Sequence, residues 1–176
     1  SLIESWHGKG RNRYVITPRF AISCSTEQLI AAGRLHEQYP GTYIQTHLSE
    51  NKDEIDSTLS LCPDCQDYLE VYERARLVTD RSIFGHCIHL SDSECRRLVE
   101  AGSVVAHCPT SNLFLGSGLF DMQQANRVGM QTVLATDIGA GTSFSMLRTM
   151  GEAYKVQQLG GYPMSVFESL YKCCLL

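Results

Sequence analysis

The sequence predicts an α/β protein in which about five strand–helix units build a parallel sheet. Three observations support this fold class. Short runs rich in β-branched and aromatic residues recur five times along the 176 residues. Helix-start signals follow most of these runs. Polar residues fall at the ends of the runs, which is the edge where functional sites assemble in parallel sheets.

The segments between the strand-like runs are long enough to return the chain through a helix, as parallel pairing requires. Residues 1–10, which precede the first run, are typical of a short helix. The five runs, in chain order, are YVITPRFAI (14–22), TYIQTHL (42–48), SIFGHCI (82–88), SVVAHC (103–108) and TVLATDI (132–138).

Paired polar residues three positions apart mark the starts of the predicted helices. These capping-box pairs are Ser25 with Gln28, Asn51 with Glu54, and Ser91 with Glu94. The third of these helices should end at Gly102. We expect a long loop over 109–118, a short helix that closes near Gly129, and a last helix through Met146 and Tyr154. Periodicity alone leaves both an open doubly wound sheet and a closed barrel possible.

Composition restricts the kind of protein. The chain is 43% hydrophobic and 19% charged with a formal net charge of -4, which describes one ordinary globular domain. No basic run suggests a nucleic-acid partner. No apolar stretch of about 18 residues suggests a membrane span, and no signal peptide opens the sequence. Eight scattered cysteines, several in apolar runs, indicate reduced thiols in the cytoplasm. Cys62 and Cys65 have zinc-knuckle spacing, but no second pair matches them.

Five polar side chains fall at or near the ends of the five strand-like runs: Arg19, His47, His86, His107 and Asp137. Neutral imidazoles and one carboxylate are good ligands for Zn²⁺ or Fe²⁺. A carboxylate after the apolar run TVLA would be costly to bury without a cation or a hydrogen-bond partner. Each group also has a structural interpretation, such as a packed histidine or an arginine salt bridge. His107 either binds the site or supports it through the loop that follows.

Glu50 lies three residues beyond His47 and has two interpretations. It either favours the positive end of the next helix or carries protons beside a metal. Arg19 is a planar donor that suits a ligand oxygen, and Phe20 offers a stacking face.

Five segments together carry a family resemblance: VITPRF, THLSENKDEI, FGHCIHLS, VAHCPTSNLFLGSG and LATDIGAGTSFSM. They resemble the metal-dependent amidohydrolase superfamily from about residue 5 to about residue 160. The order His, His, Asp on successive strands is the superfamily pattern. The PRF and HLSEN elements point to its guanine deaminase branch.

The resemblance implies a partial (β/α)₈ TIM-like barrel, with about five C-terminal units that correspond to strands 4 to 8. It implies one zinc or iron ion held by His47, His86 and Asp137, together with a His-x-His pair on the first strand. Glu50 and Asp137 would be catalytic and would carry the protons of a metal-activated water. The purine would contact Arg19, Phe20, His47, Glu50 and Asp137. The reaction would be the hydrolysis of guanine to xanthine and ammonia, in a cytoplasmic enzyme that forms a homodimer.

The sequence departs from this pattern at three points. No His-x-His occurs among its six histidines, only five strands are visible, and residues 163–176 form a tail that differs from the family. We therefore expect a barrel domain over 1–162, in a piece of a longer protein that is inactive and poorly stable alone. The alternatives are another amidohydrolase acting on a different nitrogen heterocycle, the unrelated zinc deaminase fold, or a non-catalytic truncated product. The zinc deaminase motifs His-x-Glu and Pro-Cys-x-x-Cys do not occur here.

Overall fold

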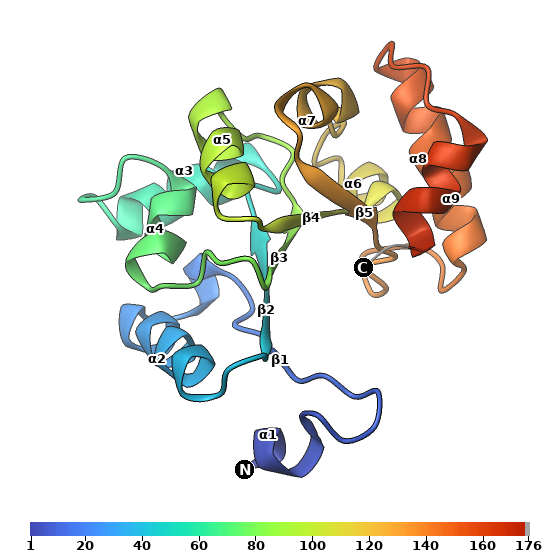
Figure 1. Cartoon of the computed structure of the whole chain (residues 1–176). Coiled ribbons are helices and arrows are strands. Elements are labelled where there is room, and N and C mark those ends of the chain that lie inside the picture. Colours follow the sequence, from blue (N-terminus) through green and yellow to red (C-terminus); the bar gives the residue numbers. More distant parts are fainter. Residues whose placement is uncertain (175–176) are drawn as a thin grey trace.

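The computed structural model describes residues 1–174, which alternate between strands and helices from the first strand onward (Figure 1). The elements are α1 (Leu2–Trp6), β1 (Val15–Ile16), the 3₁₀ turn η1 (Ala21–Ser23), α2 (Thr26–Gln38), β2 (Tyr43–Leu48), α3 (Lys52–Leu61), α4 (Tyr68–Arg74), β3 (Ser82–His86), α5 (Asp92–Glu100), β4 (Val104–His107), α6 (Pro109–Leu115), α7 (Met122–Val128), β5 (Gln131–Leu134), α8 (Met146–Leu159) and α9 (Val166–Cys174).

The five strands form one parallel sheet in the order β1-β2-β3-β4-β5. Sequential order is that of a barrel wall, because a doubly wound sheet reverses its strand order part-way. The sheet is curved, and α2 to α5 and α7 lie along its outer face (Figure 1). The prediction of α/β units on a parallel sheet is confirmed, and the order decides for the barrel architecture that periodicity had left open.

The predicted helix starts are also confirmed. Ser25, Asn51 and Ser91 each accept a bond from the backbone of the third following residue, whose side chain bonds back to the cap. Such reciprocal bonds satisfy backbone N–H groups that a helix leaves unpaired at its start. Gly129 ends α7 in the left-handed conformation, at a φ of 76°.

The hydrophobic core lies between the outer face of the sheet and the helices. Ile44, Phe84 and Val105 from three successive strands are fully buried in it, with Leu69 of α4 and Leu98 of α5. Side chains on a strand alternate between faces, so the intervening residues point to the inner face. A smaller cluster on the inner face is formed by Val104, Ala106 and Val133, which Ile83 and Ala135 flank.

Two predicted elements are wrong. The first strand was expected over 14–22, but only Val15–Ile16 pair with β2. Pro18 has no N–H to donate to a ladder, so the chain leaves the sheet before it. The segment 109–118 was expected to be a loop, but it contains α6, with Pro109 in its first turn and left-handed Gly116 as its C-cap.

Residues beyond 162 continue the fold of the described chain. Helix α9 packs against α8 and β5. The boundary of a barrel domain at residue 162 stays a prediction. Among the helices that the structure describes, none has both the length and the apolar character that crossing a membrane requires.

Candidate active site

His47 is placed by the alternation of β2. Ile44, Thr46 and Leu48 are buried, and His47 is half-buried on the opposite, inner face. Its imidazole Nδ1 lies 2.5 Å from the backbone oxygen of Arg19. Because a carbonyl only accepts, Nδ1 carries the proton, and the lone pair of Nε2 is left for a ligand.

His86 reaches the site through an unusual backbone conformation. Phe84 packs into the outer core, so strict alternation would send His86 to the same side. Instead His86 and Cys87 have φ values of 68° and 53°, in the left-handed region. The side chain of His86 is buried, and its Nδ1 lies 2.9 Å from Oδ1 of Asn112. Nε2 therefore faces the site.

Asp137 follows β5 in a tight turn. It also has a positive φ, of 46°, and its backbone oxygen accepts a 2.5 Å bond from the N–H of Gly141. A Cβ at Gly141 would lie 1.7 Å from the oxygen of Thr136, so only glycine fits there. The turn directs Oδ2 of Asp137 to 3.9 Å from Nε2 of His86.

The structure brings these three predicted ligands together. His47, His86 and Asp137 offer ligand atoms that all lie within 4.8 Å of one another, and no other such group of three or more occurs in the described residues. The same residues line a cavity of about 270 Å³ on the inner face of the sheet. Two imidazole nitrogens and one carboxylate fit a Zn²⁺ or Fe²⁺ ion and leave coordination positions open.

Glu50 lies beside this group, held from two directions. Its backbone N–H donates to Oε2 of Glu54 at 2.9 Å, and its Oε1 accepts from the hydroxyl of Ser117 at 3.3 Å. The same Oε1 lies 3.7 Å from Nδ1 of His86, and the Glu50 side chain is only 13% exposed. A carboxylate next to the three potential ligands can exchange protons with a water molecule at the site.

Arg19 and Phe20 adjoin the site through His47, and neither is among the residues that line its cavity. The Arg19 guanidinium carbon is 5.2 Å from the centroid of the Phe20 ring. The Phe20 and His47 ring centroids are 5.3 Å apart. Arg19 is exposed. Tyr72 fixes the segment that follows, because its hydroxyl accepts from the N–H of Ala21 at 3.0 Å and donates to the His47 oxygen at 2.8 Å.

The remaining strand-end residue, His107, does not join the group. It points into the outer layer, where its ring stacks on Phe120 at a centroid distance of 4.8 Å. Burial, with smaller contributions from the nearby His86 and Lys172, lowers the pKa of His107 to about 3. The sequence left His107 as either a metal ligand or a support for the site. In this arrangement the structure excludes His107 as a ligand.

Sequence reasoning missed three residues that hold the site: Asn112, Ser117 and Tyr72. Asn112 and Ser117 lie in and directly after α6, the segment that was expected to be a loop. The available signal was Pro109 followed by Gly116, which is typical of a short helix. Tyr72 gave no signal, because its partners are distant in sequence.

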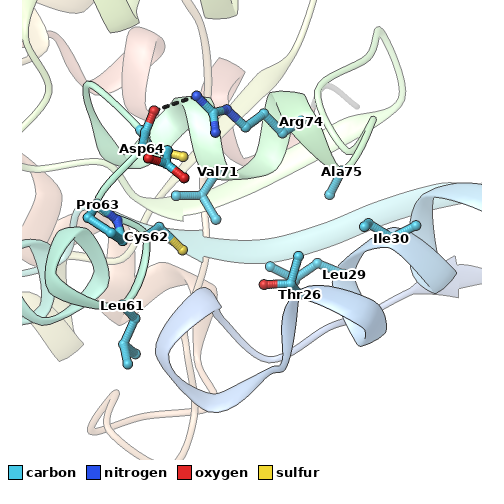
Figure 2. Close-up of a pocket in the computed structure, with 11 residues that line it drawn as sticks. Thr26, Leu29, Ile30, Leu61, Cys62, Pro63, Asp64, Val71, Arg74 and Ala75 are labelled. Atoms are coloured by element: carbon cyan, nitrogen blue, oxygen red, sulfur yellow. Dashed lines mark hydrogen bonds between the residues drawn. The ribbon is translucent and has the colours of Figure 1, made fainter.

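The Cys62–Cys65 pair lies elsewhere, at a pocket of about 230 Å³ (Figure 2). Leu29, Val71 and Ala75 contribute apolar walls, and Arg74 donates to the Asp64 carbonyl. No third metal-binding side chain joins the two thiols within the part of the chain that the structure describes. A structural zinc site here is therefore not supported, since it would need four ligands.

The model of the amidohydrolase family matches residues 2–175. The chain belongs to the amidohydrolase family. Its sequence is 52% identical to guanine deaminase of Escherichia coli K12 over 174 residues, which is 99% of this chain and 40% of that protein. The chain thus spans about 40% of the length of this amidohydrolase relative.

Solved amidohydrolase structures have the same fold. The E. coli guanine deaminase structure superposes with a TM-score of 0.95 at 52% identity, covering 98% of this chain and 40% of that one. A guanine deaminase from C. acetobutylicum, solved with bound guanine in its active site, gives a TM-score of 0.91 at 34% identity. It covers 98% of this chain and 43% of that one. The five parallel strands therefore match part of an amidohydrolase barrel.

Proposed function

We propose that this chain supplies the substrate-binding wall and part of the metal site of a guanine deaminase, which hydrolyses guanine to xanthine and ammonia. The observation that carries the proposal is the meeting of His47, His86 and Asp137 within 4.8 Å, beside Glu50. The identity of 52% to the E. coli guanine deaminase supports guanine as the substrate.

The proposed metal ligands are His47, His86 and Asp137, with one zinc or iron ion. Both imidazoles use Nδ1 for hydrogen bonds to Arg19 and Asn112, which leaves Nε2 of each for the ion. A bound ion of this kind lowers the pKa of water toward 7 and so supplies a nucleophile at neutral pH.

The proposed proton carriers are Glu50 and Asp137. Hydrolysis at C2 of the purine requires that the water lose a proton while the adjacent ring nitrogen gains one. Oε1 of Glu50 is positioned by Ser117, so this carboxylate can accept the first proton and deliver it to the ring. Asp137, 3.9 Å from His86, can hold the second proton, which leaves with ammonia.

Substrate recognition is assigned to Arg19 and Phe20, together with His47, Glu50 and Asp137. The guanidinium of Arg19 suits the carbonyl oxygen of guanine, which adenine lacks. The Phe20 ring lies next to His47 and offers a face for the purine.

The chain alone is proposed to be inactive and poorly stable. Strands β1 and β5 are the two edges of the described sheet, and exposed parallel edges are unfavourable. Its six histidines include no His-x-His pair to complete the metal site. The cytoplasmic location and the homodimeric state of the whole protein stay predictions, which fractionation and sedimentation can check.

The decisive experiment places residues 1–176 into the E. coli guanine deaminase, in exchange for the 40% of that enzyme that they match. The chimera should release ammonia from guanine and not from adenine. Its Glu50→Gln variant should keep its zinc and lose about 10²–10⁴-fold in kcat, as expected for a missing acid–base group. The 176-residue chain with zinc should release none. A folded, zinc-loaded chimera that ignores guanine would refute the function, and turnover by the chain alone would refute its incompleteness.

A further inference from the structure

Asn112 is a buried polar residue that the proposed reaction does not use. Only 2% of it is exposed, and it lies in α6, directly after the strand that carries His107. Its Oδ1 is 2.9 Å from Nδ1 of His86. Its Nδ2 has no hydrogen-bond partner among the described residues. Buried amides without a full set of partners are uncommon, and they point to a function for the bonds they do make.

Two acceptors compete for the same imidazole nitrogen. Oδ1 of Asn112 is within hydrogen-bond distance of Nδ1 of His86, whereas Oε1 of Glu50 is 3.7 Å away. A neutral imidazole has one N–H, so a bond from Nδ1 to one acceptor excludes a full bond to the other. Ser117 holds Glu50 through that same Oε1, at 3.3 Å.

The amide oxygen also decides which nitrogen keeps its lone pair. With Oδ1 as the acceptor, Nδ1 is protonated and Nε2 is free on the side of Asp137, at 3.9 Å. Without this acceptor, the proton can move to Nε2, or the ring can turn its N–H to Glu50. The first change removes a metal ligand, and the second engages the proposed proton carrier.

We propose that Asn112 is a positioning residue that holds His86 as the Nδ1–H tautomer and keeps its N–H away from Glu50. This inference rests on the proposed function, because it assigns His86 to a metal and Glu50 to proton transfer. The bond separates these two tasks, although the two side chains lie next to each other.

Helix α6 gives Asn112 the required placement. The N–H of Asn112 bonds to the Cys108 oxygen at 2.9 Å, which fixes the first turn directly after β4. Pro109 restricts the start of this turn and Gly116 ends it. The side chain is thus held by a rigid element rather than by a mobile loop.

The test compares Asn112→Leu, which removes the acceptor, with Asn112→Asp, which keeps one. Ser111→Ala is the matched control, because Ser111 is a fully buried neighbour whose hydroxyl has no partner among the described residues. Two measurements are needed, both on the chimera with the E. coli guanine deaminase, because the chain alone is proposed to be poorly stable. The first is the ¹⁵N shift of the His86 ring in the metal-free chimera. The second is the zinc Kd from competition with a chelator.

We expect the Nδ1–H tautomer in the wild type, in Asn112→Asp and in Ser111→Ala. Asn112→Leu should lose this tautomer preference and bind zinc about 10–100-fold more weakly. If Asn112→Leu does not fold, Asn112→Ser, whose hydroxyl is too short to reach Nδ1, takes its place. An unchanged tautomer and an unchanged zinc Kd in the acceptor-free variant would overturn the inference. Neither measurement uses guanine, so the outcome is independent of whether guanine is the substrate.

Discussion

The Nδ1 of His47 and the backbone oxygen of Arg19 lie 2.5 Å apart, so the main chain of Arg19 holds a potential metal ligand while its side chain is exposed. Thr46 adds a second bond to the same Arg19 oxygen, at 3.2 Å. The support of the imidazole therefore comes from a carbonyl that substitution of the Arg19 side chain leaves in place.

This relationship predicts a selective effect of Arg19→Ala. The carbonyl remains, so the zinc Kd should not change. The lost charged hydrogen bond, worth about 1.5–3 kcal/mol, should lower kcat/KM for guanine by about 10–150-fold. Steady-state kinetics and metal analysis of the chimera measure both quantities. Arg34→Ala on the exposed side of α2 is the control, and a parallel loss of zinc in Arg19→Ala would contradict the division of roles.

Tyr72→Phe should weaken the fold around the site. Burial raises the pKa of Tyr72 to about 12, so its hydroxyl stays protonated and continues to donate to the His47 oxygen. Without the hydroxyl, the buried N–H of Ala21 and the half-buried oxygen of His47 each lose a partner. The free energy of unfolding should fall by about 1–3 kcal/mol in urea titrations. The half-exposed Tyr154→Phe should change it by less than about 0.5 kcal/mol.

His107 should make the fold sensitive to acid. An unfolded histidine binds a proton at a pKa of about 6.5, whereas burial keeps the folded group neutral down to a pKa of about 3. Between these values the unfolded state binds more protons, so stability falls as the pH drops. The contribution of His107 to the free energy of unfolding is fully present above pH 6.5. Below that pH it decreases by up to about 1.4 kcal/mol per pH unit. The free energy of unfolding, measured by urea titration at several pH values from about 7 to 4, should fall less steeply with decreasing pH in His107→Leu than in the wild type. An equal pH dependence in the two proteins would assign the acid sensitivity to other groups.

Gly141→Ala should disrupt the site from outside it. The added Cβ would lie 1.7 Å from the Thr136 oxygen and 2.8 Å from the Asp137 oxygen, so the turn that directs Asp137 must shift. We expect zinc binding to weaken by about 10-fold or more, in chelator competition. Gly151→Ala is the matched control, because a Cβ there meets nothing within 4 Å and lies in a helix. It should instead raise the free energy of unfolding by about 0.5–1 kcal/mol.

The sequence by itself determined the strand–helix order, the helix starts and the choice of His47, His86 and Asp137 as converging residues. Capping boxes depend on residues three positions apart, and strand alternation has a period of two, so a short stretch of sequence is enough to predict both. The sequence left His107 open between a ligand and a support, and the structure places it in the outer layer. Asp137 could be identified because a carboxylate after an apolar run needs a partner.

Only the tertiary structure decided how the site is held together. His86 reaches the inner face through a φ of 68°, a conformation that the surrounding sequence does not predict. The contacts of Tyr72 with Ala21 and of Asn112 with His86 join residues 51 and 26 positions apart. Such contacts form only after the units pack side by side in the sheet. For that physical reason, the sequence predicts which groups meet, while packing decides their tautomers, their supports and their distances.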